Sequence, residues 1–370
     1  MLKKTLQYLL LVLFGAGTAM IGVEFIGRIV PIDSLPGSLS AIVQTMKLHG
    51  TVYRRDVYLQ YVIDPGADHL FQHREFTYRV KPGLKLGQAG FRGSPLQSPV
   101  WGIALGDSFT FGMGVEHDST WVAQLAKLTR KEIVNLGVPG WGPQQYTRAL
   151  ERFGVALKPK VVLYSLYRND LQDALLFDQW SRKPPYRQSI DTFLRLNSIV
   201  FNFFRLLAGT ITPGTERIVL ENYALKFNSK MLKHRLVTDR TGFTSAWSII
   251  KREISLAIDY SHTINTIFVL LYLPSKEEVY WEFIKEREID LGSYDHDVEI
   301  LRSHILNFCK LRKISCLDLT PAFRFKAAAG MRLYYSDDSH WNEAGNRLAA
   351  DEIYRFIRNH AETSPRVFLP

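Results

Sequence analysis

The sequence predicts an α/β fold in which a parallel sheet of five strands lies between two layers of helices. Short, continuously apolar runs that are typical of buried strands recur after residue 99, and helical patterns separate them. Parallel strands need long crossover connections, so this alternation favours a sheet covered on both faces. An apolar content of 46% is ample for such a core.

The expected elements follow in chain order. Strands are predicted at about 100–105, 132–136, 160–166, 266–273 and 314–319. Helices are predicted at about 119–130, 143–157, 244–263, 275–285, 296–312 and 342–358, the last with Asn342 as its N-cap. Five strands in this order fit a flavodoxin-like three-layer sandwich, interrupted by a helical insertion at about 171–243.

The N-terminus predicts a membrane anchor. Lys3 and Lys4 precede Leu6–Val23, an apolar run of 18 residues that is long enough to span a bilayer. Positive charge before the run predicts a single pass with the N-terminus inside, so the remaining chain would be periplasmic. A cleaved signal peptide is the alternative, and residues 16–19 are the nearest candidate for its cleavage site.

Three domains are therefore expected: an anchor at 1–29, a juxtamembrane segment at 30–97 and the α/β domain at 98–360. We expect membrane contact through residues 6–26. Within the insertion, residues 193–207 are apolar almost all round and too short to span a bilayer. They form either an interfacial helix on anionic lipid or a part of the core or a lid.

The net charge and the cysteine content exclude few classes of protein. The net charge is +10, and residues 181–252 carry 13 Lys and Arg against 4 Asp and Glu, a local excess of +9. Such a block favours an anionic partner, although a solvated surface explains it equally well. We expect no nucleic-acid partner. Cys309 and Cys316 leave a disulfide open.

Polar residues follow the predicted strands at the points where those strands end. Ser108 follows the first strand, Gly140 lies after the second and Asn169 after the third. Asp337 and His340 stand in the loop before the last helix. The carboxyl ends of parallel strands meet at one edge of a sheet, so we expect these residues to meet there.

These residue types suit nucleophilic acyl chemistry. Ser108 would supply the attacking oxygen, and His340 would take its proton and return it to the leaving group. Asp337, three residues before His340, would accept from Nδ1–H and hold the tautomer. Asp338 is the alternative for that task.

A tetrahedral intermediate also needs donors for its oxyanion. The backbone N–H groups of Ser108 and Gly140 and the side-chain amide of Asn169 would provide three. Glycine at position 140 permits a close backbone approach. Asn169 is a neutral donor, so it would not charge the resting site.

Four blocks of this sequence resemble the SGNH hydrolase family, also called GDSL-type esterases. They are Gly106-Asp107-Ser108, the segment from Asn135 to Gly140, Asn169, and Asp337-x-x-His340. The resemblance covers about 98–170 and 245–358. It implies a flavodoxin-like fold and the hydrolysis or transfer of O-acyl groups through an acyl-serine.

The sequence departs from the family pattern at three positions. Tyr167 stands where the family usually has glycine, and Arg168 precedes Asn169. A bulky Tyr167 would narrow the pocket or displace the amide donor. Trp341 stands where many members carry proline.

We therefore expect a membrane-anchored serine esterase or acyltransferase that acts, without metal or organic cofactor, on an O-acylated envelope glycan or lipid. The acyl group would be acetyl, and the enzyme would work beside envelope polysaccharide machinery. The alternative is a non-catalytic carbohydrate-binding or assembly protein with the same fold. His69, His73 and residues 295–297 stand in loop-like contexts, and we expect no metal site there.

Overall fold

The structure is a computed structural model with two compact units. It describes residues 2–29, 51–207, 215–219, 224–228, 240–285 and 299–363. The first unit comprises Met1–Tyr61 and Pro184–Pro213, and the second comprises Val62–Lys183 and Gly214–Pro370. Every candidate catalytic residue belongs to the second unit.

The first unit contains α1 (Leu2–Ile29), β1 (Tyr53–Asp56), α8 (Pro185–Asn197) and α9 (Ile199–Leu207). The apolar residues 193–207, which the sequence leaves open as an interfacial helix, a part of the core or a lid, are divided between α8 and α9. The chain is extended at Ser198, whose hydroxyl accepts from the Phe201 N–H at 3.1 Å and begins α9. In the described part of the chain, no helix meets the length and apolarity required to cross a bilayer.

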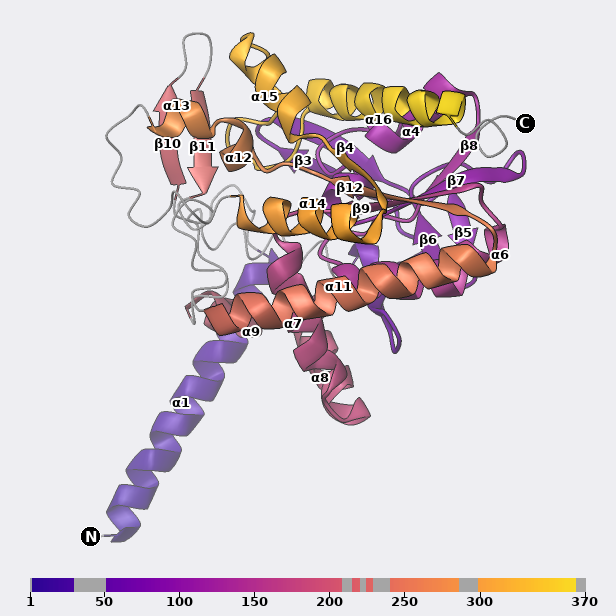
Figure 1. Cartoon of the computed structure of the whole chain (residues 1–370). Helices are drawn as coiled ribbons and strands as arrows, with labels where there is room; N and C mark the ends of the chain where they lie inside the picture. The colour runs from indigo at the N-terminus through magenta and orange to yellow at the C-terminus, as the bar shows by residue number, and fades with distance from the viewer. Residues whose placement is uncertain are drawn as a thin grey trace. The chain divides into compact units, whose positions relative to one another are not determined.

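The second unit is built on the predicted parallel sheet (Figure 1). Its strands are β7 (Val100–Leu105), β8 (Glu132–Asn135), β9 (Val161–Leu166), β12 (Ile267–Tyr272) and β13 (Ser315–Asp318). They lie in the order β13-β12-β9-β7-β8, and every pair is parallel. All six residues of the central strand, β9, are buried. The α/β class and the five strands are thus confirmed.

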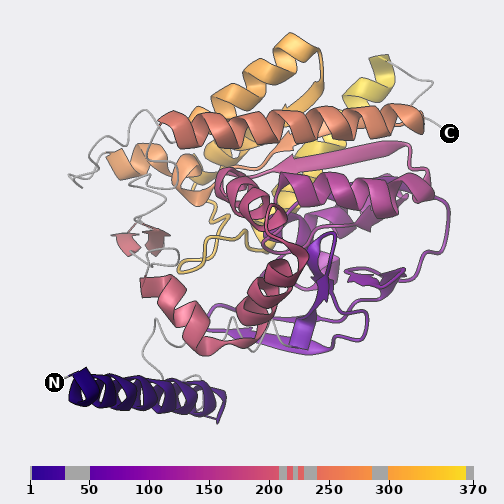
Figure 2. The ribbon, with the colours of Figure 1, turned by 90° about the horizontal axis from the view of Figure 1, so that it is seen from below.

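Helices cover both faces of this sheet. They are α4 (Trp121–Thr129), α5 (Pro143–Ala149), a π-helical turn (Leu150–Gly154), α6 (Val155–Leu157), α7 (Asp170–Ser181), α11 (Arg240–Thr263), α14 (Ile300–Arg312), α15 (Thr320–Ala328) and α16 (Glu343–Thr363). Figure 1 shows α4 and α16 together on one side of the sheet and α11 and α14 on the other, and Figure 2 shows α11 beside α14 from below. The observed layers are those of the predicted sandwich.

Smaller elements surround the sheet. They are β2 (Gln60–Ile63), β3 (His69–His73), β4 (Phe76–Val80), β5 (Leu84–Leu86), β6 (Ala89–Phe91), α3 (Ser108–Phe111), a 3-10 turn (His117–Ser119), β10 (Thr215–Val219), β11 (Ala224–Asn228), α12 (Lys276–Val279) and α13 (Trp281–Lys285). Strands β3 and β4 form an antiparallel hairpin whose two-residue turn is Arg74-Glu75. Cys309 and Cys316 are free thiols.

The strand order locates the site. After β8 the chain returns to the other side of β7, so the direction of winding reverses between β7 and β9. Ligands of open α/β sheets bind beyond the carboxyl ends of the strands at such a switch point. Ser108 follows β7 there, and Asn169 follows β9.

Candidate active site

Ser108 is held by a tight turn between β7 and α3. A side chain at Gly106 would meet Thr110 Oγ1 at 2.1 Å, so only glycine fits. Asp107 is the N-cap of α3, and its Oδ1 accepts from the Phe109 N–H at 2.9 Å. Ser108 is then the first helical residue, and its backbone N–H has no partner within the helix.

His340 reaches Ser108 across 232 residues of sequence. Its Nε2 lies 2.8 Å from Ser108 Oγ. The loop that carries His340 closes on itself, because the Tyr335 N–H donates to the His340 carbonyl at 3.1 Å and Tyr334 bridges to Trp341. The ring of Phe109 packs against the imidazole at a centroid distance of 4.9 Å. The predicted contact between Ser108 and His340 is confirmed.

The predicted contact between Asp337 and His340 is wrong. Asp338 Oδ1 lies 2.6 Å from His340 Nδ1 and also accepts from the His340 backbone N–H at 2.8 Å. Asp337 instead forms ion pairs with Arg74 and with Lys226, whose Nζ lies 2.5 Å from Asp337 Oδ1. A carboxylate two residues before an amide can close an Asx-turn on it, and this turn brings Asp338 to the imidazole.

The electrostatics favour a charged acceptor beside the imidazole. Burial lowers the pKa of His340, but the neighbouring Asp338 carboxylate outweighs it and the pKa is raised. Burial raises the pKa of Asp338, but its charge and hydrogen-bond contacts with His340 dominate and hold it well below the ordinary range. Asp338 is therefore ionised at neutral pH, where it fixes Nδ1–H and leaves Nε2 free to accept the Ser108 proton.

The structure places Gly140 and Asn169 on the two loops that flank Ser108. The Gly140 loop is attached to α3, because the Asn135 side chain donates to the Thr110 carbonyl at 2.7 Å and accepts from the Gly137 N–H at 2.9 Å. Gly140 has a positive φ of 75° and is exposed. Asn169 lies close enough to the buried Asp107 to help lower its pKa, which burial raises.

The side chains at the three positions that depart from the family pattern are buried. The Tyr167 side chain is only 3% exposed, and its ring packs on that of Phe109 at 4.2 Å. Trp341 is buried too and meets the Phe109 ring edge to face at 5.1 Å. Buried Arg168 lowers the pKa of Glu278, which burial raises. Tyr167 thus supports the nucleophile loop from behind.

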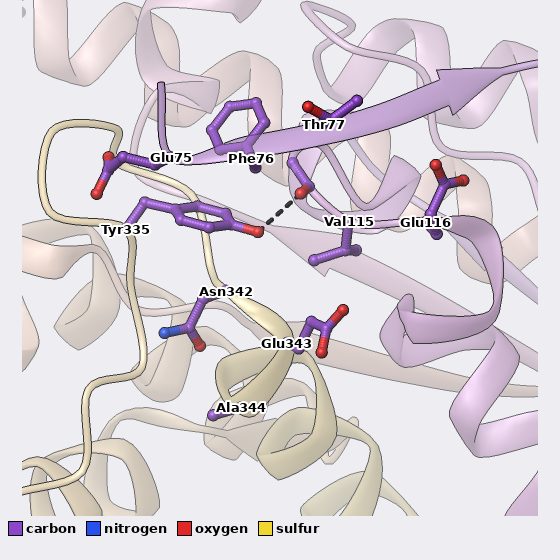
Figure 3. Close-up of a pocket in the computed structure, with 10 residues that line it drawn as sticks. Glu75, Phe76, Thr77, Val115, Glu116, Tyr335, Asn342, Glu343 and Ala344 are labelled. Atoms are coloured by element: carbon purple, nitrogen blue, oxygen red, sulfur yellow. Dashed lines mark hydrogen bonds between the residues drawn. The ribbon is translucent and has the colours of Figure 1, made fainter. Parts of the chain in front are cut away.

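A pocket of about 520 Å³ lies beside Tyr335, near the start of the loop that carries His340 (Figure 3). Its wall includes Glu75, Phe76, Glu116, Tyr335 and Glu343. Several polar groups of this wall already have partners within the protein. The Tyr335 hydroxyl, for example, donates to the Gly114 carbonyl at 2.7 Å.

Sequence reasoning missed four charged residues around this loop. Arg74 and Glu75 come from the hairpin turn, Lys226 from β11 and Lys276 from the start of α12. The alternating strand pattern at 75–80 indicates a strand but nothing about a contact some 260 residues away. Among the described residues, no group of three or more potential ligands could hold a metal ion, and residues 295–297 lie outside them.

Comparison with known families adds independent evidence. Residues 262–367 match the family model described as SGNH hydrolase-like domain, acetyltransferase AlgX. This part of the chain is therefore similar to an SGNH hydrolase-like domain. The matched stretch contains Asp338 and His340, and the structure joins its histidine to Ser108, which lies outside that stretch. The match and the contact between Ser108 and His340 support an esterase or an acyltransferase.

Solved structures show weak overall similarity. The acetyl xylan esterase AlAXEase is 13% identical, with 69% of this chain and 98% of that chain covered and a TM-score of 0.40. The psychrotrophic esterase EstA from Pseudoalteromonas sp. is 14% identical, with 72% and 100% covered and a TM-score of 0.38. A GDSL-like lipase from Bacteroides thetaiotaomicron VPI-5482 is 11% identical, with 74% and 92% covered and a TM-score of 0.36. A comparison with curated proteins found no match.

Proposed function

We propose that this protein hydrolyses or transfers O-acyl groups through an acyl-serine intermediate. Ser108 Oγ attacks the ester carbonyl carbon while His340 Nε2 takes the hydroxyl proton. The tetrahedral intermediate collapses, the ester C–O bond breaks, and His340 returns the proton to the departing alcohol. Water or a sugar hydroxyl then attacks the acyl carbon and releases Ser108. The 2.8 Å contact between Ser108 and His340 is the observation that carries this proposal.

The oxyanion of each tetrahedral intermediate would be bound by three neutral donors. These are the backbone N–H of Ser108, the backbone N–H of Gly140 and the side-chain amide of Asn169. All three come from loops that follow the neighbouring strands β9, β7 and β8. Such donors stabilise charge that develops only in the transition state.

The substrate class we propose is an O-acylated envelope glycan or lipid, with acetyl as the acyl group. The family description supports this choice, because it names an acetyltransferase. A carbohydrate-binding protein without catalysis is the rival function. The bulk of Tyr167 would favour this rival if it displaced the amide donor, but that side chain lies in the core.

We also propose that the enzyme is anchored in a membrane with its active site in the periplasm, near envelope polysaccharide machinery. The support is the sequence of residues 1–29, with two lysines before an apolar run. In the first unit, Tyr186, Ile190 and Phe193 are exposed at helical spacing along α8. Together with the exposed Arg187 of the same helix, they would rest on anionic lipid. Alkaline carbonate extraction of membranes tests the anchor, since an anchored chain stays in the pellet.

Reaction with a fluorophosphonate probe tests the proposed chemistry. The reagent phosphonylates a serine that an adjacent base has activated. We expect labelling of the wild type and none of Ser108→Ala. A wild type that is folded but unlabelled would exclude the acyl-serine mechanism and favour the carbohydrate-binding function.

A further inference from the structure

We propose that Glu75 and Lys276 are positioning residues that hold the catalytic loop, residues 335–340, so that His340 meets Ser108. The proposal rests on the acyl-transfer function proposed for that site. Neither residue touches the reacting atoms, and each acts on the backbone of the loop from a different element. Glu75 lies in the turn of the β3–β4 hairpin, and Lys276 is the first residue of α12.

Glu75 binds the amide side of the catalytic loop. Its Oε1 accepts from the Ser336 N–H at 2.6 Å. Its Oε2 accepts from the N–H groups of Asp337 and Asp338 at 2.7 and 3.2 Å. One carboxylate thus accepts hydrogen bonds from three successive backbone amides. Hydrogen bonds to a charged acceptor are shorter and stronger than those between neutral groups. Figure 3 shows Glu75 beside this loop and Glu116 at the opposite side of the cavity.

Lys276 binds the carbonyl side of the same loop. Its ammonium donates to the carbonyls of Tyr335, Ser336 and Asp338 at 3.0, 3.2 and 2.7 Å. The residue is 1% exposed, and an ammonium buried to this extent is tolerated only when its donors are satisfied. The Ser275–Glu278 capping box fixes the start of α12 and therefore the origin of the lysine side chain.

The two residues together determine which carboxylate meets the imidazole. With three amides bound to Glu75 and three carbonyls bound to Lys276, the backbone of residues 335–338 has little freedom. On that path Asp337 faces Arg74 and Lys226, while Asp338 closes its turn on His340. Loss of the hydrogen bonds from either Glu75 or Lys276 would let the imidazole move away from Ser108. A shift of about 1 Å can lower a rate about 10²-fold.

The test uses full-length Glu75→Gln and Lys276→Met with p-nitrophenyl acetate as substrate. Gln keeps the length of Glu but turns an amide group toward the loop N–H groups, and Met keeps the stem of Lys without its donors. We expect kcat to fall about 10- to 100-fold with KM within about threefold. The control is Glu116→Gln, which lines the same cavity and accepts from the Arg79 N–H at 3.0 Å but does not touch the loop. Its kcat should equal that of the wild type.

A pH profile separates positioning from general loss of structure. The charged groups that face His340 are Asp338 on its own loop, Asp107 after β7 and Lys276 on α12. The Lys276 charge opposes protonation of the imidazole, so its removal should move the acidic limb of kcat/KM to higher pH. The control variant should keep the wild-type limb.

The outcomes are distinguishable. If the wild type neither cleaves the ester nor reacts with a fluorophosphonate, the proposed function fails and this proposal falls with it. If the wild type is active and both folded variants keep kcat within about twofold, the positioning role is overturned while the function stands. Circular dichroism and melting curves establish folding. If Lys276→Met does not fold, Glu75→Gln decides alone, because its site lies at a hairpin turn.

Discussion

Asp338 Oδ1 lies 2.6 Å from His340 Nδ1, and the adjacent Asp337 points instead to two cations. The imidazole is therefore oriented by the carboxylate two residues before it. This spacing lets one oxygen accept from both the backbone N–H and the ring of His340. The two aspartates, although adjacent in sequence, have separable tasks.

The first prediction separates those tasks by mutation. Asp338→Asn should lower kcat about 10⁴-fold, because an amide at this position favours the wrong imidazole tautomer. Asp337→Asn should lower kcat no more than about tenfold, since it removes ion pairs and leaves the contact with the ring. Both variants should be compared with the wild type in p-nitrophenyl acetate hydrolysis. A larger loss in Asp337→Asn would mean that the carboxylates exchange roles during turnover.

The second prediction concerns pH. Only a neutral imidazole can accept the Ser108 proton, so kcat/KM should rise as pH rises through the pKa of His340. Burial lowers that pKa, but the Asp338 carboxylate raises it by more than burial lowers it. The midpoint therefore lies above the ordinary value of 6.5. In Asp338→Asn the imidazole is still buried but has lost the neighbouring carboxylate charge. The pKa of His340 should therefore fall, and the midpoint should move to lower pH. A midpoint that does not move would mean that the acidic limb reports the titration of a group other than His340.

The third prediction tests the amide donor. Asn169→Ala should lower kcat about 10²- to 10³-fold, which corresponds to about 2.7–4 kcal/mol in the barrier. Asn169 is the N-cap of α7 but makes no capping hydrogen bond with its side chain, so the start of the helix should persist. The side chain does contact the buried Asp107, so the melting temperature should fall modestly. Gln172→Ala, in the first turn of the same helix, is the control. Unchanged turnover in Asn169→Ala would remove this residue from the mechanism.

The strands and the nucleophile–base pair could be predicted because each depends on local patterns. Strands β7, β9 and β12 are short apolar runs, and Ser108, Asn169 and His340 lie where a parallel sheet must bring its loops together. Helix α15 was missed although Pro321 follows Thr320 in its first turn, which is a usable signal for a helix start. Ser198, a good N-cap residue, likewise signals the break between α8 and α9.

The choice between Asp337 and Asp338 could not be read from the sequence. Both carboxylates lie within reach of His340 in an unconstrained loop, and family spacing favours Asp337. The choice depends on the path of residues 335–338, which Glu75 and Lys276 fix from positions 59 or more residues away. Contacts between residues so far apart in the sequence cannot be predicted from local sequence patterns.

The last prediction concerns Tyr167, whose hydroxyl is buried and makes no hydrogen bond within the part of the chain that the structure describes. A buried polar group without a partner costs about 1–3 kcal/mol, so Tyr167→Phe should raise the free energy of unfolding by about 1 kcal/mol. Its kcat should stay within about twofold, because the ring supports Phe109 without facing the substrate. Tyr164→Phe is the matched control: that hydroxyl donates to the Pro143 carbonyl at 2.8 Å, and its loss should destabilise the fold. Urea unfolding and ester hydrolysis measure both variants. A large fall in kcat for Tyr167→Phe would place the hydroxyl among the groups that act on the acyl intermediate.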